Sequence, residues 1–91
     1  MATIWKFPLV DSNVREDGSL VLEMPEDAEV LCVQLQQDNP AVWAKVDPNL
    51  PMVARKFFVV GTGQTFPEGA SEYLGTWQKD ASVLHLFEGN S

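Results

Sequence analysis

Apolar and polar residues alternate with a period of two in six to seven short stretches of the chain, which is the pattern of half-buried β-strands. The clearest stretch ends at Gly61 and concentrates aromatic and β-branched residues. No stretch keeps the apolar periodicity of a helix for three turns, so we expect at most one short helical turn, near Pro25 or Pro67. The expected strands cover residues 3–10, 19–24, 29–37, 41–46, 53–61, 73–77 and 83–87.

Turn-forming residues separate these stretches. Asp38-Asn39-Pro40 predicts a hairpin between the strands on either side of it, and Lys79-Asp80 predicts a second hairpin near the end of the chain. Residues 11–18 close on Asp-Gly and predict a long loop between the first two strands, which allows a hairpin there too. The chain is therefore expected to form a single domain over residues 1–91, mainly β, built as a small antiparallel barrel or sandwich.

Composition narrows the classes of protein and partner. With 91 residues, 45% of them hydrophobic, the chain is long enough for one core. Six Lys and Arg against thirteen Asp and Glu give a net charge of −7, which opposes binding to nucleic acid or anionic lipid over a broad surface. No apolar run approaches the roughly 20 residues of a membrane-spanning helix, and the first residues lack the pattern of a signal peptide. We therefore expect a cytosolic protein.

The motif Gly61-Thr62-Gly63 follows the clearest strand and could present amide donors and a hydroxyl to a phosphate or carboxylate. Arg55 and Lys56 lie at the other end of the same strand. Phosphate-binding loops need more glycines and a following helix, so we interpret the motif first as a tight turn that requires glycine. An anion site made by these residues is the alternative.

Aromatic residues and one histidine are the other candidates for binding. Trp43, Tyr73 and Trp77 offer flat surfaces for a base, a sugar or a partner side chain, and Trp43 shares a strand face with polar Lys45. His85 is the single histidine, and Cys32 the single cysteine, so neither a metal site nor a disulfide is expected. We interpret His85 first as a hydrogen-bonded structural residue and second as a binding contact.

Several short motifs occur in a characteristic order along nearly the whole chain. They are Ile4-Trp5-Lys6-Phe7-Pro8, Met24-Pro25-Glu26-x-Ala28, Trp43-Ala44-x-Val46-Asp47-Pro48, Val59-Val60-Gly61-Thr62-Gly63, Tyr73-Leu74-Gly75-Thr76 and His85-x-Phe87. In this order they resemble a family of short uncharacterised proteins encoded by tailed bacteriophages and prophages. The resemblance implies a phage protein that acts in the host cytoplasm or is packaged in the virion, and it implies no activity or cofactor.

These observations favour a small non-enzymatic binding protein. We expect it to counteract a host defence, either by binding a host protein or by sequestering a small nucleotide signal, with no cofactor and with a homo-oligomer as one way to build the site. A virion or assembly component is the alternative, and a small enzyme that uses His85 with a nearby acid is the least favoured. The candidate binding residues are Trp43, Arg55, Lys56, Gly61, Thr62, Gly63, Tyr73, Trp77 and His85.

Overall fold

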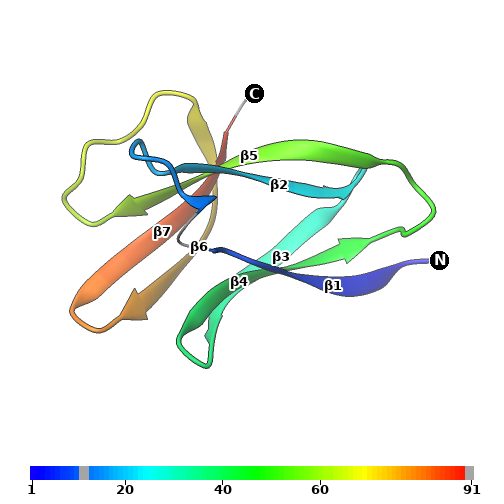
Figure 1. Ribbon diagram of the computed structural model, residues 1–91, viewed down its shortest axis with the longest axis horizontal. Coiled ribbons are helices and arrows are strands. Elements are labelled where there is room, and N and C mark those ends of the chain that lie inside the picture. The colour runs from blue at the N-terminus through cyan, green and yellow to red at the C-terminus, as the bar shows by residue number, and fades with distance from the viewer. Residues whose placement is uncertain (11–12, 90–91) are drawn as a thin grey trace.

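Seven antiparallel β-strands make up the fold in the computed structural model, which describes residues 1–10 and 13–89 (Figure 1). The strands are β1 (Thr3–Pro8), β2 (Ser19–Pro25), β3 (Glu29–Gln36), β4 (Asn39–Val46), β5 (Met52–Gly61), β6 (Ala70–Lys79) and β7 (Ser82–Gly89). The expected mainly β class is confirmed, and the described residues contain no α-helix. The same ranges hold no helix of the length and apolarity that crossing a membrane requires.

The short helical turn expected near Pro25 or Pro67 is replaced by two tight turns. The carbonyl of Pro25 accepts a hydrogen bond from the amide of Ala28 at 3.1 Å, and that of Pro67 accepts one from Ala70 at 3.4 Å. The third residue of each turn has a positive φ, 66° at Asp27 and 91° at Gly69. The two Pro-Glu-x-Ala sequences therefore form the same kind of local turn, and each one leads towards the next strand.

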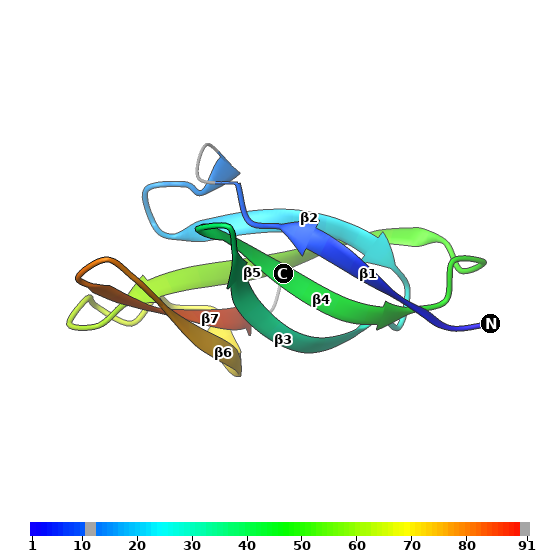
Figure 2. The same cartoon turned by 90° about the horizontal axis from the view of Figure 1, so that it is seen from below.

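The strands divide into a three-stranded sheet with the order β1-β4-β3 and a four-stranded sheet with the order β2-β5-β7-β6. A hairpin between the first two strands is not formed, because β1 pairs with β4 and β2 pairs with β5. Local alternation places a strand but does not select its partner, and here the chain between β1 and β2 passes from one sheet to the other. Figure 2 shows β1 and β2 crossing in the two layers.

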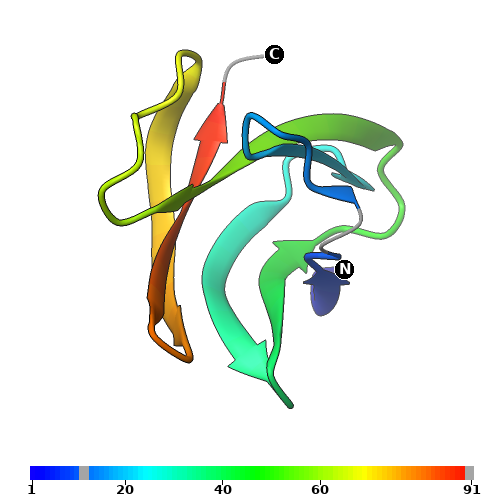
Figure 3. The ribbon, with the colours of Figure 1, turned by 60° about the vertical axis from the view of Figure 1, so that its left-hand side comes forward.

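Both other expected hairpins are confirmed. The β3–β4 turn consists of Gln37 and Asp38, whose φ angles of 51° and 66° are those of a tight hairpin turn. This turn lies one residue earlier than expected, because Asn39 and Pro40 already belong to β4. The β6–β7 hairpin turns at Asp80, and the tips of the two hairpins lie at the same end of the molecule (Figure 3).

The core lies between the two sheets and is formed by alternate residues of their strands. Phe57, Leu20, Met24 and Leu86 come from the four-stranded sheet, and Val42, Ala44, Val46 and Val33 come from the three-stranded sheet. The sheets approach closely where β3 meets β6, because a Cβ added at Gly75 of β6 would overlap Val33 of β3. The arrangement is therefore a sandwich whose layers are closed on the β3–β6 side.

The outer face of the four-stranded sheet is also partly covered. Phe58 points away from the core yet is buried, because the segment after β5 folds back over it. A Cβ built on Gly69 of this segment would lie 3.7 Å from the ring of Phe58. Phe66 of the same segment packs edge-on against Phe87 of β7, with the ring centroids 5.0 Å apart. This second apolar cluster supports the residues of the candidate site.

Candidate functional site

A row of hydrogen-bonded polar side chains crosses the outer face of the four-stranded sheet. Thr76 of β6 and His85 of β7 are directly opposite each other in the strand register. Thr76 Oγ1 lies 2.9 Å from His85 Nδ1 and 2.7 Å from the Tyr73 hydroxyl, while Thr62 Oγ1 lies 2.9 Å from His85 Nε2. We call these four residues, Tyr73, Thr76, His85 and Thr62, the His85 row.

The direction of each hydrogen bond in the His85 row follows from the number of protons available. Thr62 Oγ1 donates its one proton to the carbonyl of Val83 at 3.3 Å, so it accepts a proton from His85 Nε2. In the tautomer with the proton on Nε2, Nδ1 accepts from the Thr76 hydroxyl, which in turn accepts from the Tyr73 hydroxyl. Both ring nitrogens are thus occupied, and the row presents a fixed arrangement of hydroxyl groups to solvent.

One exposed aromatic ring belongs to the His85 row and a second lies near it. Tyr73 is 57% exposed and Phe66 is 53% exposed, and both rings pack edge-on against Phe87. On the same outer face, the ammonium group of Lys56 lies 5.3 Å from the ring centroid of Phe58. The surface therefore offers flat apolar contact area beside hydroxyl groups, a combination that is common at binding surfaces.

The residues expected to form an anion site do not come together. Arg55 lies six positions before Gly61 on β5, about 20 Å away along an extended strand. Its guanidinium makes a bidentate ion pair with Glu88, at 2.6 and 2.7 Å, and donates a third hydrogen bond to the carbonyl of Ala28. The hydrogen bonds to Glu88 raise the pKa of Arg55; burial opposes this increase, and the negative charges of Glu88 and Glu72 add to it.

The backbone of the Gly61-Thr62-Gly63 turn is also engaged. The amide of Gly61 donates to the side-chain oxygen of Gln64 at 2.8 Å, and the amide of Thr62 donates to the carbonyl of Val83 at 3.0 Å. Gly63 has a φ of 89°, a conformation that favours glycine. The structure thus agrees with a tight glycine turn, whose contribution to the outer face is the hydroxyl of Thr62.

Both tryptophans considered as contacts lie away from the outer face. Trp43 is half-buried on β4 of the other sheet, and Trp77 is 6% exposed and faces the core from β6. Thr76 and Phe66 are not among the residues expected from the sequence. Thr76 lies opposite His85 because the β6–β7 turn is formed by residues 80 and 81, one position later than expected, and nothing in the sequence indicated that Phe66 folds onto β7.

Residues 1–91 match the family described as Domain of unknown function (DUF7352). The chain belongs to this family. No curated protein and no solved structure matches the chain. The description of this family assigns no activity.

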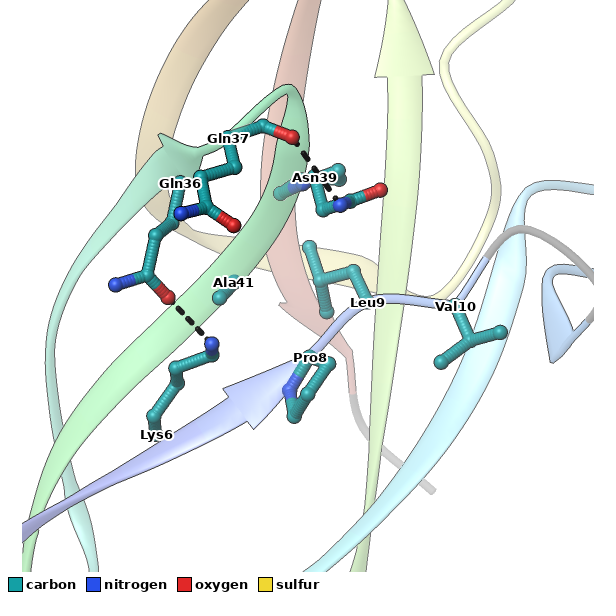
Figure 4. Close-up of a pocket in the computed structure, with 9 residues that line it drawn as sticks. Lys6, Pro8, Leu9, Val10, Gln36, Gln37, Asn39 and Ala41 are labelled. Atoms are coloured by element: carbon teal, nitrogen blue, oxygen red, sulfur yellow. Dashed lines mark hydrogen bonds between the residues drawn. The ribbon is translucent and has the colours of Figure 1, made fainter.

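A hollow of about 470 Å³ lies on another part of this family member, between the end of β1 and the β3–β4 hairpin (Figure 4). Lys6 and Gln36 point towards each other across it and are hydrogen-bonded, and the side-chain amide of Asn39 donates to the backbone carbonyl of Gln37 at 3.2 Å. Leu9 forms part of its apolar wall. These polar groups are already hydrogen-bonded to one another in two pairs, so few donors in the hollow are free to bind a ligand.

Proposed function

We propose that this protein is a phage-encoded, non-enzymatic binding protein that counteracts a host defence. It binds its partner through the outer face of β5, β7 and β6. The observation that carries the proposal is the His85 row, a fixed line of hydroxyl and imidazole groups that includes the exposed ring of Tyr73, with the exposed ring of Phe66 nearby. Side chains that are already held in place lose little conformational freedom when a partner binds, which favours affinity.

The hydrogen bonds of His85 support binding over catalysis. A general base needs a ring nitrogen free to accept a proton from a substrate, and an orienting carboxylate on the other nitrogen is the usual arrangement. Here the partners of both nitrogens are threonine hydroxyls. The ring acts in this proposal as a link between two strands and a loop, and the exposed partner contact is made by Tyr73 and Phe66 beside it.

Of the two partner classes expected from the sequence, a host protein fits this surface better than a small nucleotide. Arg55 is bound by Glu88, and the amides of Gly61 and Thr62 are hydrogen-bonded within the protein, so these groups are not free for phosphate. The net charge of −7 also repels a polyanion at long range. Exposed Tyr and Phe on a sheet face suit a protein partner, because aromatic residues are enriched at such interfaces.

The test is recovery of a host protein from a bacterial lysate on immobilised protein, compared between three forms. Tyr73→Ala should lower the affinity for the recovered protein by roughly 10-fold to 100-fold, the effect of losing a central aromatic contact. Leu31→Ala, at a similarly exposed position on β3 of the other sheet, should leave it unchanged. Equal recovery by both variants would contradict the proposed surface.

Titration calorimetry with a panel of nucleotides tests the other partner class. We expect no heat of binding from any nucleotide if the partner is a protein. Heat with one nucleotide that Tyr73→Ala abolishes would move the function to nucleotide sequestration at the same surface. No heat together with no recovered host protein would contradict the proposed function as a whole.

An assembly role in the virion is the second candidate, and a different surface favours it. β1 is an edge strand of the three-stranded sheet and exposes Ile4 at 59% and Trp5 at 37%. Exposed edges with apolar residues are suited to pairing with a strand of another subunit. Mass spectrometry of purified particles would find the protein in them if this role holds, and its absence would exclude the role.

A further inference from the structure

We propose that the protein forms a weak two-fold symmetric dimer, in which strand β1 pairs antiparallel with β1 of a second copy around Trp5. β1 is an edge strand of the three-stranded sheet and exposes Ile4 at 59% and Trp5 at 37%. The inference does not rest on the proposed host partner, because β1 and the outer face of β5, β7 and β6 belong to different sheets. Its test involves no host protein.

Among the edge strands β1, β2, β3 and β6, β1 has the most open edge. β3 and β6 face each other where the sheets meet, since a Cβ added at Gly75 would overlap Val33. The start of β2 is covered, because the carbonyl of Ser19 accepts a hydrogen bond from the amide of Arg15 at 2.8 Å. Within residues 1–10 and 13–89, the backbone of Thr3–Pro8 makes no hydrogen bond except those with β4. A further strand therefore fits best beside β1.

The register of β1 shows which of its backbone groups point outward. The amide of Leu9 donates to the carbonyl of Pro40 at 2.9 Å, one pair beyond the end of β1. Hydrogen-bonded pairs alternate along antiparallel strands, so the pair of Trp5 with β4, four positions back, is hydrogen-bonded too. The two-residue turn of the β3–β4 hairpin sets the same alternation for β4. The amides and carbonyls of Ile4 and Lys6 therefore point away from β4 into solvent.

These outward groups are self-complementary about Trp5, which favours a second copy of the chain as the partner. In a two-fold antiparallel pair centred on this residue, Ile4 of each copy lies opposite Lys6 of the other, and these two residues exchange both backbone hydrogen bonds. The two-fold axis repeats the exchange on the other side of Trp5. Lys6 then lies opposite an apolar side chain and not opposite its own counterpart, so no like charges meet.

The neighbouring registers fit less well. A pair centred on Lys6 would place two ammonium groups opposite each other and would set Ile4 opposite Pro8, which has no amide to donate. A pair centred on Ile4 would set Lys6 opposite Ala2, which lies outside β1. The register about Trp5 is therefore the one that pairs both outward amides within β1 without opposing like charges.

Trp5 supplies the apolar part of the contact. It lies opposite buried Ala44, so its side chain is on the core-facing side of the sheet, and its ring centroid is 6.4 Å from that of Phe7. The sandwich is closed between β3 and β6, and β1 and β2 are the edges on its other side. In the dimer the two copies of Trp5 form a non-hydrogen-bonded pair, in which Cα atoms are closest, so the indoles meet and shield one another from water.

The size of this contact determines the strength of the dimer. A pair of six-residue strands buries less than the roughly 1,200 Å² of a stable interface. The net charge of −7 also makes two copies repel each other at low salt. We expect a dissociation constant of about 100 µM in about 0.3 M NaCl, which screens the repulsion. β1 is therefore free in dilute solution and paired at high local concentration.

Sedimentation equilibrium at a series of protein concentrations tests the dimer. We expect the average mass to rise from monomer towards dimer through about 100 µM. Ile4→Pro should weaken the association by at least about tenfold, because it removes an outward amide from each copy and none of the hydrogen bonds with β4. A protein that stays monomeric up to about 1 mM would overturn the proposal, as would unchanged association of Ile4→Pro.

Val21→Pro is the matched control, at the edge of the other sheet. Val21 is 41% exposed on β2. The amide of Val59 donates to the carbonyl of Gly18 at 2.8 Å, and the alternation from this bond points the amide of Val21 away from β5. We expect Val21→Pro to leave the association unchanged. Weaker association of Val21→Pro with no effect of Ile4→Pro would show that the dimer pairs through β2 and would overturn the proposal.

Cross-linking tests the register, and it decides the matter if a proline variant does not fold. In a Cys32→Ala background, which removes the single native cysteine, oxidised glutathione should link Trp5→Cys into a disulfide dimer. Opposite residues of a non-hydrogen-bonded pair have Cα atoms about 4.5 Å apart, within the range of a disulfide. Ile4→Cys is the control, because its two copies would lie more than about 7 Å apart. Links in Ile4→Cys alone, equally in both variants, or in neither would overturn the proposed pairing.

Discussion

Single glycines control where the chain can pass close to a neighbouring strand, and Gly18 is the sharpest case. Its φ is 84°, and a Cβ added there would lie 2.5 Å from the carbonyl oxygen of Val59. That contact is with backbone, which cannot rotate away, and the amide of Val59 also donates to the carbonyl of Gly18 at 2.8 Å. The start of β2 is therefore set against β5 by the absence of a side chain.

Gly18→Ala should lower the free energy of unfolding by about 3 kcal/mol, because backbone strain and a steric overlap act together. Gly63→Ala is the matched control, since Gly63 has a similar φ of 89° but nothing within 4 Å of its added Cβ. It should cost only about 1 kcal/mol. Urea denaturation measures both, and equal losses would show that the overlap at Gly18 is relieved elsewhere.

The stability of the same region depends on pH through the carboxylate of Asp17. The hydroxyl of Ser19 donates to the Asp17 carboxylate at 2.6 Å and the backbone amide of Ser19 donates at 2.9 Å, and these bonds lower the pKa of Asp17 from its ordinary value of 3.8. A lowered pKa in the folded state means that ionised Asp17 contributes stability above the ordinary value. This contribution is lost as the pH falls through the lowered pKa.

Asp17→Asn should therefore differ from the wild type most at and above about pH 5, and the difference should shrink as the pH falls below about 3. Unfolding experiments at several pH values measure this gap. In a Ser19→Ala background the gap should be smaller at every pH, because the hydroxyl that makes the largest contribution is gone. A gap that does not change with pH would contradict the hydrogen bonds to the carboxylate.

At the scale of elements, the β3–β4 hairpin carries local strain that a different turn sequence would remove. Gln37 and Asp38 both have positive φ angles, of 51° and 66°, although neither is glycine. Two-residue turns of this geometry favour Asn-Gly. The double variant Gln37→Asn, Asp38→Gly should raise the free energy of unfolding by about 1 kcal/mol, as measured by thermal or urea denaturation.

The neighbouring Asn39 gives the control for this prediction. It is the first residue of β4, it lies outside the residues with positive φ, and its side chain donates to the carbonyl of Gln37 at 3.2 Å. Asn39→Gly should therefore destabilise the protein, because it removes this bond and loosens a strand. A double variant that is no more stable than the wild type would show that the turn is not strained.

The strands of the molecule differ in how many neighbours they pair with and in how much of their surface is buried. β5 is paired on both sides, by β2 and β7, and contributes buried Phe57 to the core, whereas β1 pairs only with β4 and is mostly exposed. Regions with few buried contacts open without global unfolding. We expect the slowest amides of β5 to exchange hydrogen at the rate of global unfolding and the slowest amides of β1 to exchange at least about 100 times faster.

Hydrogen exchange measured by NMR checks this prediction strand by strand. β4 is the internal reference, because it is the central strand of the sheet to which β1 belongs and should be protected nearly as well as β5. Equal protection of β1 and β5 would contradict the contrast between the two strands. It would indicate instead that another chain covers β1, as the assembly role would require.

The alternation of residues by itself determined the class of fold, the position of all seven strands and two of the hairpins, because these depend on side-chain spacing and on turn residues close together in the sequence. It also placed Val42, Ala44 and Val46 on one apolar face, which the structure buries.

Only the tertiary structure decided which strands pair across the chain and which candidate residues meet. Three of these features join segments that are distant in sequence: the pairing of β1 with β4, the ion pair of Arg55 with Glu88, and the contact of Phe66 with Phe87. The inward position of Trp77 depends on which face of its sheet is covered. Alternation of period two is the same for either face and for any partner strand. The sequence could therefore name Tyr73, His85 and Thr62 as separate candidates, but only the packing of the second sheet and of the loop after β5 joined them into one surface.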